Sequence, residues 1–154
     1  MDRLSRTGDA GRYAFPRVQV HDAPLDMSFS GLKTAAINLI HNARQKEEAL
    51  DLPSLAASFS AAVSDMLVPR VMEAARRCGR RKVAGAGGVA ANSHIRADLE
   101  AACAAAGCRL YLPPLSLCGD NGAMIGCQAY YEYLAGHTAD MALNAYANRD
   151  IAKG

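Results

Sequence analysis

A glycine-rich turn is the part of the sequence best suited to chemistry. Residues 82–92, KVAGAGGVAAN, pass from a short apolar run through the pair Gly87 and Gly88 into a helical pattern. This order predicts a strand, a tight turn in which Gly88 takes a positive φ, and the start of a helix. Backbone N–H groups at such a turn, with the unpaired donors and positive dipole end of the helix, favour a negative charge. We therefore expect a phosphorylated or nucleotide-like anion to bind here.

Two helices are predicted ahead of this turn. Ser30 precedes apolar residues at helical spacing and is the expected N-cap of a helix that runs to about Gln45. Lys33 falls in its first turn, where a cation is unfavourable, so it is either a functional residue or a surface lysine whose stem covers apolar side chains. An apolar stripe predicts a second helix over residues 51–78, and Pro69 should kink or split it.

The elements after the turn complete an α/β pattern. A helix runs from Ile95 and stops at Gly107, and residues 109–112 form a second short strand. Strand, helix and strand imply a parallel pair with a right-handed crossover. Asp120 is a plausible N-cap for a last helix that ends near Gly136. The predicted fold class is thus α/β, a helix-rich lobe with short parallel strands, and its ligand should lie beyond their carboxyl ends.

The chain is expected to be the C-terminal piece of a longer protein. Residues 1–26 are predicted to be an irregular lead-in, in which only residues 13–15 could form an edge strand. Such a long irregular start suggests that it continues from a missing N-terminal half. Residues 27–137 are expected to form the lobe itself, and residues 138–154 a weakly patterned tail that frays.

Charge is local in this chain. The 17 basic and 15 acidic residues leave a formal net charge of +2, so no strong overall field argues for a nucleic acid or an anionic membrane. A basic cluster surrounds Gly79, which stands where a C-cap glycine would. We interpret the cluster as cations that favour a helix C-terminus, with a phosphate contact as the alternative. Its members are Arg76, Arg77, Arg80, Arg81 and Lys82.

The cysteines and the apolar runs indicate a cytoplasmic protein. Five cysteines are an odd number without a C-x-x-C pair, which is typical of reduced thiols. We expect them to be buried as small apolar side chains rather than to bind metal. No apolar run is expected to reach the length that spans a bilayer, so no membrane partner is predicted.

Three motifs carry a resemblance to a known family. Residues 87–92, GGVAAN, followed by Ile95 and Arg96, resemble the "GGVAAN..LR" signature of the bacterial tRNA threonylcarbamoyladenosine synthesis family. Residues 28–35, SFSGLKTA, and residues 118–125, CGDNGAMI, resemble two further motifs of that family, in the same order. The resemblance covers nearly the whole chain. It implies that residues 27–137 form part of the second lobe of an actin-like, sugar kinase and Hsp70 ATPase fold.

The resemblance also implies a reaction and a site. In that family a threonylcarbamoyl group passes from threonylcarbamoyl-AMP to N6 of adenosine 37 of tRNA. Asn92 matches the family asparagine that binds the nucleotide, beside Gly87 and Gly88. Asp120 matches an aspartate that ligates one divalent metal ion, iron or zinc. The implied partners are tRNA, a paralogous bacterial protein and a small ATPase, and the apolar surface of an orphaned lobe would favour self-association.

The resemblance is incomplete at the metal. The family's other ligands are two histidines of an H-x-x-x-H motif in the N-terminal half, whereas His21, His41, His94 and His137 have no such spacing. One carboxylate is not a metal site. A non-catalytic nucleotide-binding or interaction fragment is therefore an alternative function.

A dinucleotide-binding module is a further alternative. Residues 85–90 also match G-x-G-x-x-A between a strand and a helix. The acidic residue expected at the end of the next strand is missing, because residues 112–114 are Leu-Pro-Pro.

Overall fold

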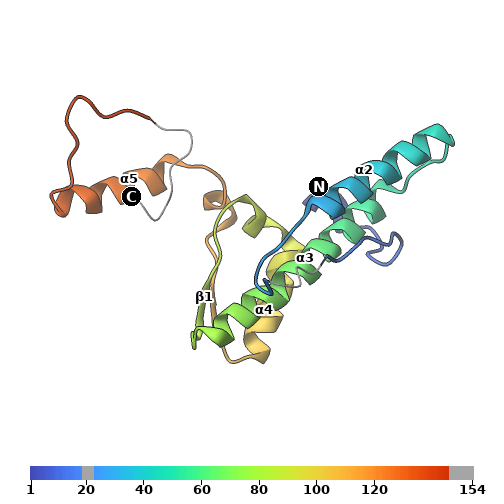
Figure 1. Cartoon of the computed structure of the whole chain (residues 1–154), viewed down its shortest axis with the longest axis horizontal. Coiled ribbons are helices and arrows are strands. Elements are labelled where there is room, and N and C mark those ends of the chain that lie inside the picture. The colour runs from blue at the N-terminus through green and yellow to red at the C-terminus, as the bar shows by residue number, and fades with distance from the viewer. Residues whose placement is uncertain (19–22, 146–154) are drawn as a thin grey trace. The chain divides into compact units, whose positions relative to one another are not determined.

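The computed structural model describes residues 1–18 and 23–145, which divide into two compact units, Met1–Gly119 and Asp120–Gly154. The second unit holds one described helix, α5 (Gly122–Leu134). The elements of the first unit are α1 (Asp2–Ser5), α2 (Ser30–Gln45), α3 (Leu52–Arg77), β1 (Lys82–Ala84), the 3-10 helix η1 (Gly88–Ala91), α4 (Ser93–Ala105), β2 (Arg109–Tyr111) and the 3-10 helix η2 (Leu115–Leu117) (Figure 1). This composition confirms a helix-rich α/β lobe, whereas the actin-like assignment stays an expectation. Of the predicted tail, residues 146–154 lie outside the described residues.

Helix α3 is the centre of the first unit. Asp51 is its N-cap and accepts a hydrogen bond from the Ser54 backbone N–H at 3.2 Å. The helix continues through Pro69, so the predicted split does not occur. Buried residues lie on both sides of the proline, Val68 before it and Ala75 after it, and their packing offsets the lost backbone hydrogen bond.

Two apolar clusters on α3 form the core. The first consists of Phe15, Leu32, Leu55, Ala62 and Met66. The second joins α3 to α4 through Val68, Ile95 and Leu99, and the two helices run beside each other (Figure 1). Burial of these side chains removes apolar surface from water. The resulting hydrophobic effect is the main force that holds the unit together.

The length of α3 corrects one prediction. Among the described residues, α3 alone, with 26 residues, is long and apolar enough to span a membrane by length and composition. The expectation that no apolar run reaches such a length was wrong. Because α3 supplies residues to both core clusters, we interpret it as the core helix of the unit.

The lead-in is irregular but docked. Residues 13–15, the only ones there that could have formed an edge strand, form none, which agrees with the predicted irregular lead-in. Their partners are side chains of α3 rather than a neighbouring strand. The Ser58 hydroxyl accepts a hydrogen bond from the Tyr13 backbone N–H at 3.2 Å. The Phe15 ring packs edge-on against Phe59, with the ring centroids 5.7 Å apart. The proposed domain boundaries at 26 and 137 stay predictions.

Helix ends follow the glycines. After α3, Gly79 has φ +61°, and the Arg80 N–H donates to the Ala75 carbonyl at 2.8 Å, which confirms the predicted cap. Gly107 ends α4 in the same way with φ +63°. At the start of α2 the prediction is off by one residue. Ser30 is already helical and its N-cap is Phe29, which has no side-chain oxygen to accept a hydrogen bond.

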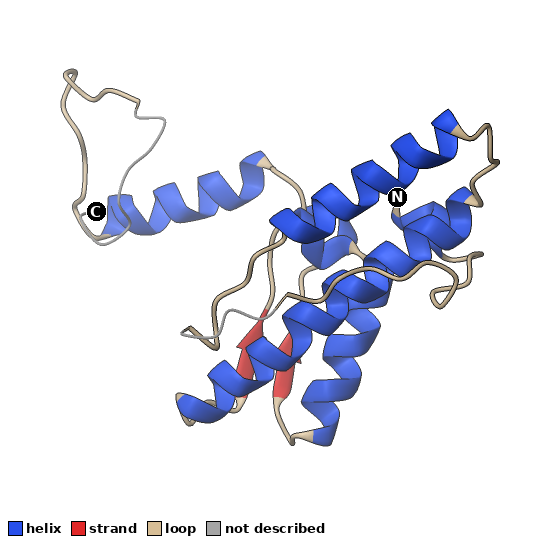
Figure 2. Cartoon of the chain, turned by 45° about the vertical axis from the view of Figure 1, so that its right-hand side comes forward, coloured by secondary structure: helices blue, strands red, loops and turns tan. Residues whose placement is uncertain are grey.

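The two strands pair in parallel, as predicted. Lys82 lies opposite Arg109, and Ala84 lies opposite Tyr111. Helix α4 is the crossover between them, and Figure 2 shows the two short strands side by side. Beyond the last pair, the Gly85 N–H donates to the Tyr111 carbonyl at 3.0 Å. The glycine turn therefore leaves directly from the carboxyl end of this small sheet.

Candidate functional site

The glycine turn bends at Gly87, not at Gly88. Gly87 has φ +87°, a region that favours glycine, whereas Gly88 is the first residue of η1 and does not adopt a positive φ. The prediction for Gly88 was therefore wrong, because the chain needs only one left-handed residue to turn from the strand into η1. An added Cβ would meet no atom within 4 Å at either glycine, so a ligand can approach both backbones closely.

Two backbone donors in this turn are available. Gly88 and Val89 are exposed, and neither N–H donates a hydrogen bond to any described residue. In a 3-10 helix each N–H donates to the carbonyl three residues earlier, so the first N–H groups of η1 have no acceptor within it. The turn thus has two backbone N–H groups that are free to meet an anion, and anion binding there stays a prediction.

Asn92 is the N-cap of α4. Its Oδ1 accepts hydrogen bonds from the backbone N–H groups of His94 at 3.0 Å and Ile95 at 3.1 Å. The side-chain amide nitrogen donates to no described residue. Asn92 therefore fixes the start of the helix with one atom and leaves the other free to meet a ligand.

Asp2 binds the first backbone N–H of α4, which Asn92 does not reach. Its Oδ1 accepts from the backbone N–H of Ser93 at 2.6 Å and from the Ser93 hydroxyl at 2.8 Å, and Arg6 binds its other oxygen at 2.8 Å. The hydrogen bonds from Ser93, backbone first and hydroxyl second, hold the pKa of Asp2 below its usual value, with a smaller contribution from Arg6. The sequence analysis missed Asp2, because no local pattern connects residues 91 positions apart.

Two neighbouring cavities open around these groups. One, of about 430 Å³, is lined by Asp2, Gly88 and Asn92 among others. The other, of about 590 Å³, is mostly apolar, and its only charged lining residue is Lys33. Both are lined by Val89, so they adjoin at η1. The structure thus brings Lys33, from the first motif, beside the glycine turn of the second.

Arg96 connects the second motif to the beginning of the third. Its guanidinium donates to the Ala90 carbonyl at 2.7 Å and to the Pro113 carbonyl at 2.9 Å. It also lies 3.6 Å from the sulfur of Cys118, which is buried. One side chain of α4 therefore holds the glycine turn and the end of β2 in a fixed arrangement. The sequence analysis quoted Arg96 within a motif but gave it no role.

Asp120 is exposed and is not the N-cap of α5. The cap is Asn121, whose Oδ1 accepts from the Met124 N–H at 3.0 Å, because α5 begins at Gly122 and places Asp120 one residue too early. The predicted cap was wrong. Among the described residues, no group of three or more His, Cys, Asp or Glu side chains could hold a metal ion. Asp120 therefore has no companion ligands there, and His21 lies outside the described residues.

The cysteines follow the prediction only in part. All five are free thiols, and Cys103 and Cys118 are buried. Burial raises the pKa of Cys103, which suits an inert apolar side chain. Cys78 and Cys127 are exposed and Cys108 is half-buried, so the prediction of buried side chains was wrong for these three.

Fold and site together define a class. A parallel β1–α4–β2 unit with an open glycine turn at its carboxyl end is typical of proteins that bind nucleotides or phosphorylated ligands. A family model described as tRNA N6-adenosine threonylcarbamoyltransferase matches residues 1–127, and the chain belongs to that family. The matched range contains all three motifs.

Curated relatives agree with this assignment. The chain is 46% identical over 145 residues to the tRNA N6-adenosine threonylcarbamoyltransferase of Moorella thermoacetica, which covers 94% of this chain and 42% of that protein. It is 44% identical over 151 residues to the protein of the same name from Staphylococcus saprophyticus, covering 98% of this chain and 44% of that protein. The chain thus spans less than half the length of these relatives, which are named as enzymes that act on tRNA.

Proposed function

We propose that this chain is the C-terminal part of an enzyme that transfers the threonylcarbamoyl group from threonylcarbamoyl-AMP to N6 of adenosine 37 in tRNA. The observation that carries the proposal is the convergence at η1. Lys33 of the first motif and the turn of the second line adjoining cavities, and Arg96 connects that turn to Cys118 of the third. Such a convergence of separate segments around adjoining cavities is typical of a ligand site.

The proposed reaction needs a place for the leaving phosphate. N6 attacks the carbamoyl carbon of threonylcarbamoyl-AMP, and the bond between that carbon and the phosphate oxygen breaks. N6 loses a proton, and AMP leaves with the negative charge on its phosphate. The free N–H groups of Gly88 and Val89 would donate hydrogen bonds to that phosphate, because oriented backbone donors stabilise a developing anion without reorganising. The amide nitrogen of Asn92 would orient the nucleotide, with Gly87 allowing close approach.

The family resemblance implies one divalent metal ion, iron or zinc. Of the described residues only Asp120 would serve as a ligand, and no described cluster completes the set. The described part of the chain does not by itself fit a metal site, so its ligands would have to come largely from the rest of the complete protein.

We further propose a cytoplasmic location and several partners. These are tRNA, a paralogous bacterial protein and a small ATPase. Self-association is also expected of α5, which has no buried residue and exposes Ile125 by 72% and Tyr133 by 70%. An exposed apolar surface of this kind is typical of an interface.

Reconstitution tests the function. The chain is co-purified with the N-terminal part of the Moorella relative that it does not match, then incubated with threonylcarbamoyl-AMP and unmodified tRNA. Mass spectrometry of the digested tRNA should reveal threonylcarbamoyladenosine. The chain alone should give none. An inactive pair, beside an active intact relative, would instead favour the non-catalytic fragment.

A variant pair then tests the site. Asn92→Ala should abolish modification and weaken AMP binding in the reconstituted protein, whereas Asn38→Ala, on an exposed position of α2, should change neither. Calorimetry with NADH provides the third comparison. Binding of NADH in preference to AMP would support the dinucleotide-binding alternative.

A further inference from the structure

Four cations gather at the amino ends of the two strands. Arg80, Arg81 and Lys82 are consecutive and exposed, and Lys82 lies opposite Arg109 in the strand register. The Arg109 N–H also donates to the Arg81 carbonyl at 2.7 Å, which ties the two chain segments together. We call Arg80, Arg81, Lys82 and Arg109 the basic edge.

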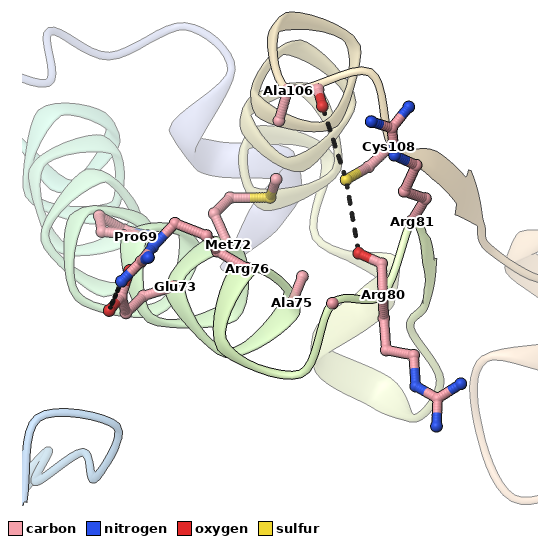
Figure 3. Close-up of a pocket in the computed structure, with 10 residues that line it drawn as sticks. Pro69, Met72, Glu73, Ala75, Arg76, Arg80, Arg81, Ala106 and Cys108 are labelled. Carbon is pink, nitrogen blue, oxygen red and sulfur yellow. Dashed lines mark hydrogen bonds and ion pairs between the residues drawn. The ribbon is translucent and has the colours of Figure 1, made fainter.

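The neighbouring carboxylate, Glu73, is already paired with two arginines of α3. Glu73 binds Arg76 and Arg77, each at 2.7 Å, and these hydrogen bonds lower the pKa of Glu73 to about 2. Figure 3 shows Arg76 folded back onto Glu73, whereas Arg80 and Arg81 extend away from it. Among the described residues, no acidic side chain pairs with any member of the basic edge.

The helix dipole does not account for the basic edge. Its effect fades within the last turn of a helix. Arg76 and Arg77 lie in the last turn of α3, but Arg80 and Arg81 follow the capping glycine and Lys82 begins β1. Like charges on paired strands destabilise a sheet. The interpretation of the whole cluster as cations at a helix end therefore holds only for its first two members.

Shape and an aromatic ring complete the surface. A cavity of about 530 Å³ lies where α3 ends, and Arg76, Arg80 and Arg81 contribute to its lining (Figure 3). On β2, the Arg109 guanidinium lies 5.0 Å from the centre of the Tyr111 ring, and Tyr111 is 41% exposed. Exposed aromatic rings among cations are suited to stacking on unpaired bases.

We propose that the basic edge binds the phosphate backbone of RNA, with Tyr111 stacking on a base. Guanidinium groups match phosphate oxygens in pairs, and an anionic partner would relieve the repulsion between Lys82 and Arg109. The choice of RNA rests on the proposed function. The four cations are separate from the glycine turn, because they lie at the amino ends of the strands and the turn follows the carboxyl end of β1, about 10 Å along the strand. Tyr111 ends β2 opposite Ala84, so an RNA backbone held by the cations would run along β2 to bring a base to its ring.

Salt-dependent RNA binding tests the proposal. Fluorescence anisotropy of the full chain with an unmodified, labelled tRNA is measured at several NaCl concentrations. Each lost phosphate contact should lower the slope of log affinity against log salt by about 0.7–0.9, so Arg80→Gln/Arg81→Gln should lose about 1.5. The matched control is Arg44→Gln/Lys46→Gln, which removes the same charge from the end of α2. An equal loss in both variants would overturn the proposal.

Tyr111 provides an independent arm. Tyr111→Leu should weaken RNA binding by about five-fold or more, whereas Tyr111→Phe should retain it, because the ring is the stacking group. Circular dichroism confirms that each variant folds. Wild-type RNA affinity in the arginine double variant, with loss of binding to an acidic protein, would overturn the assignment to RNA.

The outcomes separate this inference from the proposed function. RNA binding needs neither donor nor metal, so it can be lost in Arg80→Gln/Arg81→Gln even when reconstitution gives no modified tRNA. In that case only the proposed function fails. Modified tRNA from the reconstituted protein, with RNA affinity unchanged by the double variant, would overturn only the basic edge.

Discussion

The two ends of the β1–α4–β2 unit treat charge in opposite ways. At the carboxyl end, the helix N-terminus was expected to stand open for an anion, but the chain supplies its own carboxylate from Asp2 and leaves only the turn donors free. At the amino end, the basic edge has no acidic partner among the described residues. The difference indicates that a pattern of charged residues predicts a ligand site only once it is known which of those groups the chain's own side chains already bind.

The largest expected loss of stability comes from a substitution, Gly8→Ala, that disturbs the packing at the carboxyl end. A Cβ added to Gly8 would lie 2.1 Å from the Pro53 carbonyl oxygen, a backbone atom that cannot move aside easily. Gly8→Ala should therefore displace the segment that carries Asp2 and lower the free energy of unfolding by about 1–3 kcal/mol. Urea denaturation measures this loss. Gly11→Ala is the control, because its Cβ would meet only the Asp9 side chain, at 3.4 Å.

Asp2→Asn tests the same end without a steric change. The pKa of Asp2 is lowered by folding, so its stabilisation is present above the ordinary value of 3.8 and is lost as the pH falls through the folded value. At pH 7 the variant should be less stable by about 1 kcal/mol, since hydrogen bonds to a charged acceptor are stronger. Denaturation curves for the two proteins should converge at acid pH. A constant difference from pH 7 to acid pH would contradict the role of the charge.

Lys82→Glu sharpens the comparison at the amino end. The new carboxylate would lie opposite Arg109 in the strand register, so opposite charges would replace like charges on this pair. Stability should rise by about 0.2–1 kcal/mol at low salt. Thermal unfolding at low and high NaCl measures the gain, which salt should screen. RNA affinity should fall in the same variant.

Lys46→Glu is the control for this charge reversal. Lys46 follows the last residue of α2 and has no paired arginine in the strands, so the same change of charge should give no comparable gain. An equal gain in both variants would contradict the argument from strand pairing.

Local signals account for what the sequence predicted. The stripe of α3, the glycines after α3 and α4, and the turn at residues 82–92 each depend on neighbours in the chain. These elements were predicted to within a few residues. The motifs also pointed to Asn92, whose capping role the structure adds.

Long-range contacts account for what was missed. The pairing of Asp2 with Ser93 and the docking of Phe15 on α3 join segments far apart in sequence, and no periodicity reports them. The choice between Asp120 and Asn121 failed for another reason. Both side chains cap helices equally well, so only the backbone geometry, extended at Asn121 with φ −152°, decides between them.

The smallest expected effect on stability belongs to Asp120. Because Asn121 caps α5, Asn121→Ala should cost about 1 kcal/mol of helix stability, whereas Asp120→Ala, at an exposed position outside the helix, should stay within about 0.5 kcal/mol. A helix of 13 residues without buried side chains is marginal by itself. Global unfolding is therefore a poor measure, and the Cα chemical shifts of residues 122–134 in the full chain should be followed instead.

Metal content separates the two roles of this segment. If Asp120 ligates the family's metal, Asp120→Ala and Asp120→Asn should both lower metal content in the reconstituted protein while the α5 shifts remain unchanged, because neither variant touches the cap. Asn121→Ala should do the reverse, reducing helical shifts more than metal content. If metal content is unchanged in both Asp120 variants, Asp120 is not a metal ligand. Because Asn121 already caps α5, Asp120 would then have neither of the two roles that the sequence suggested for it.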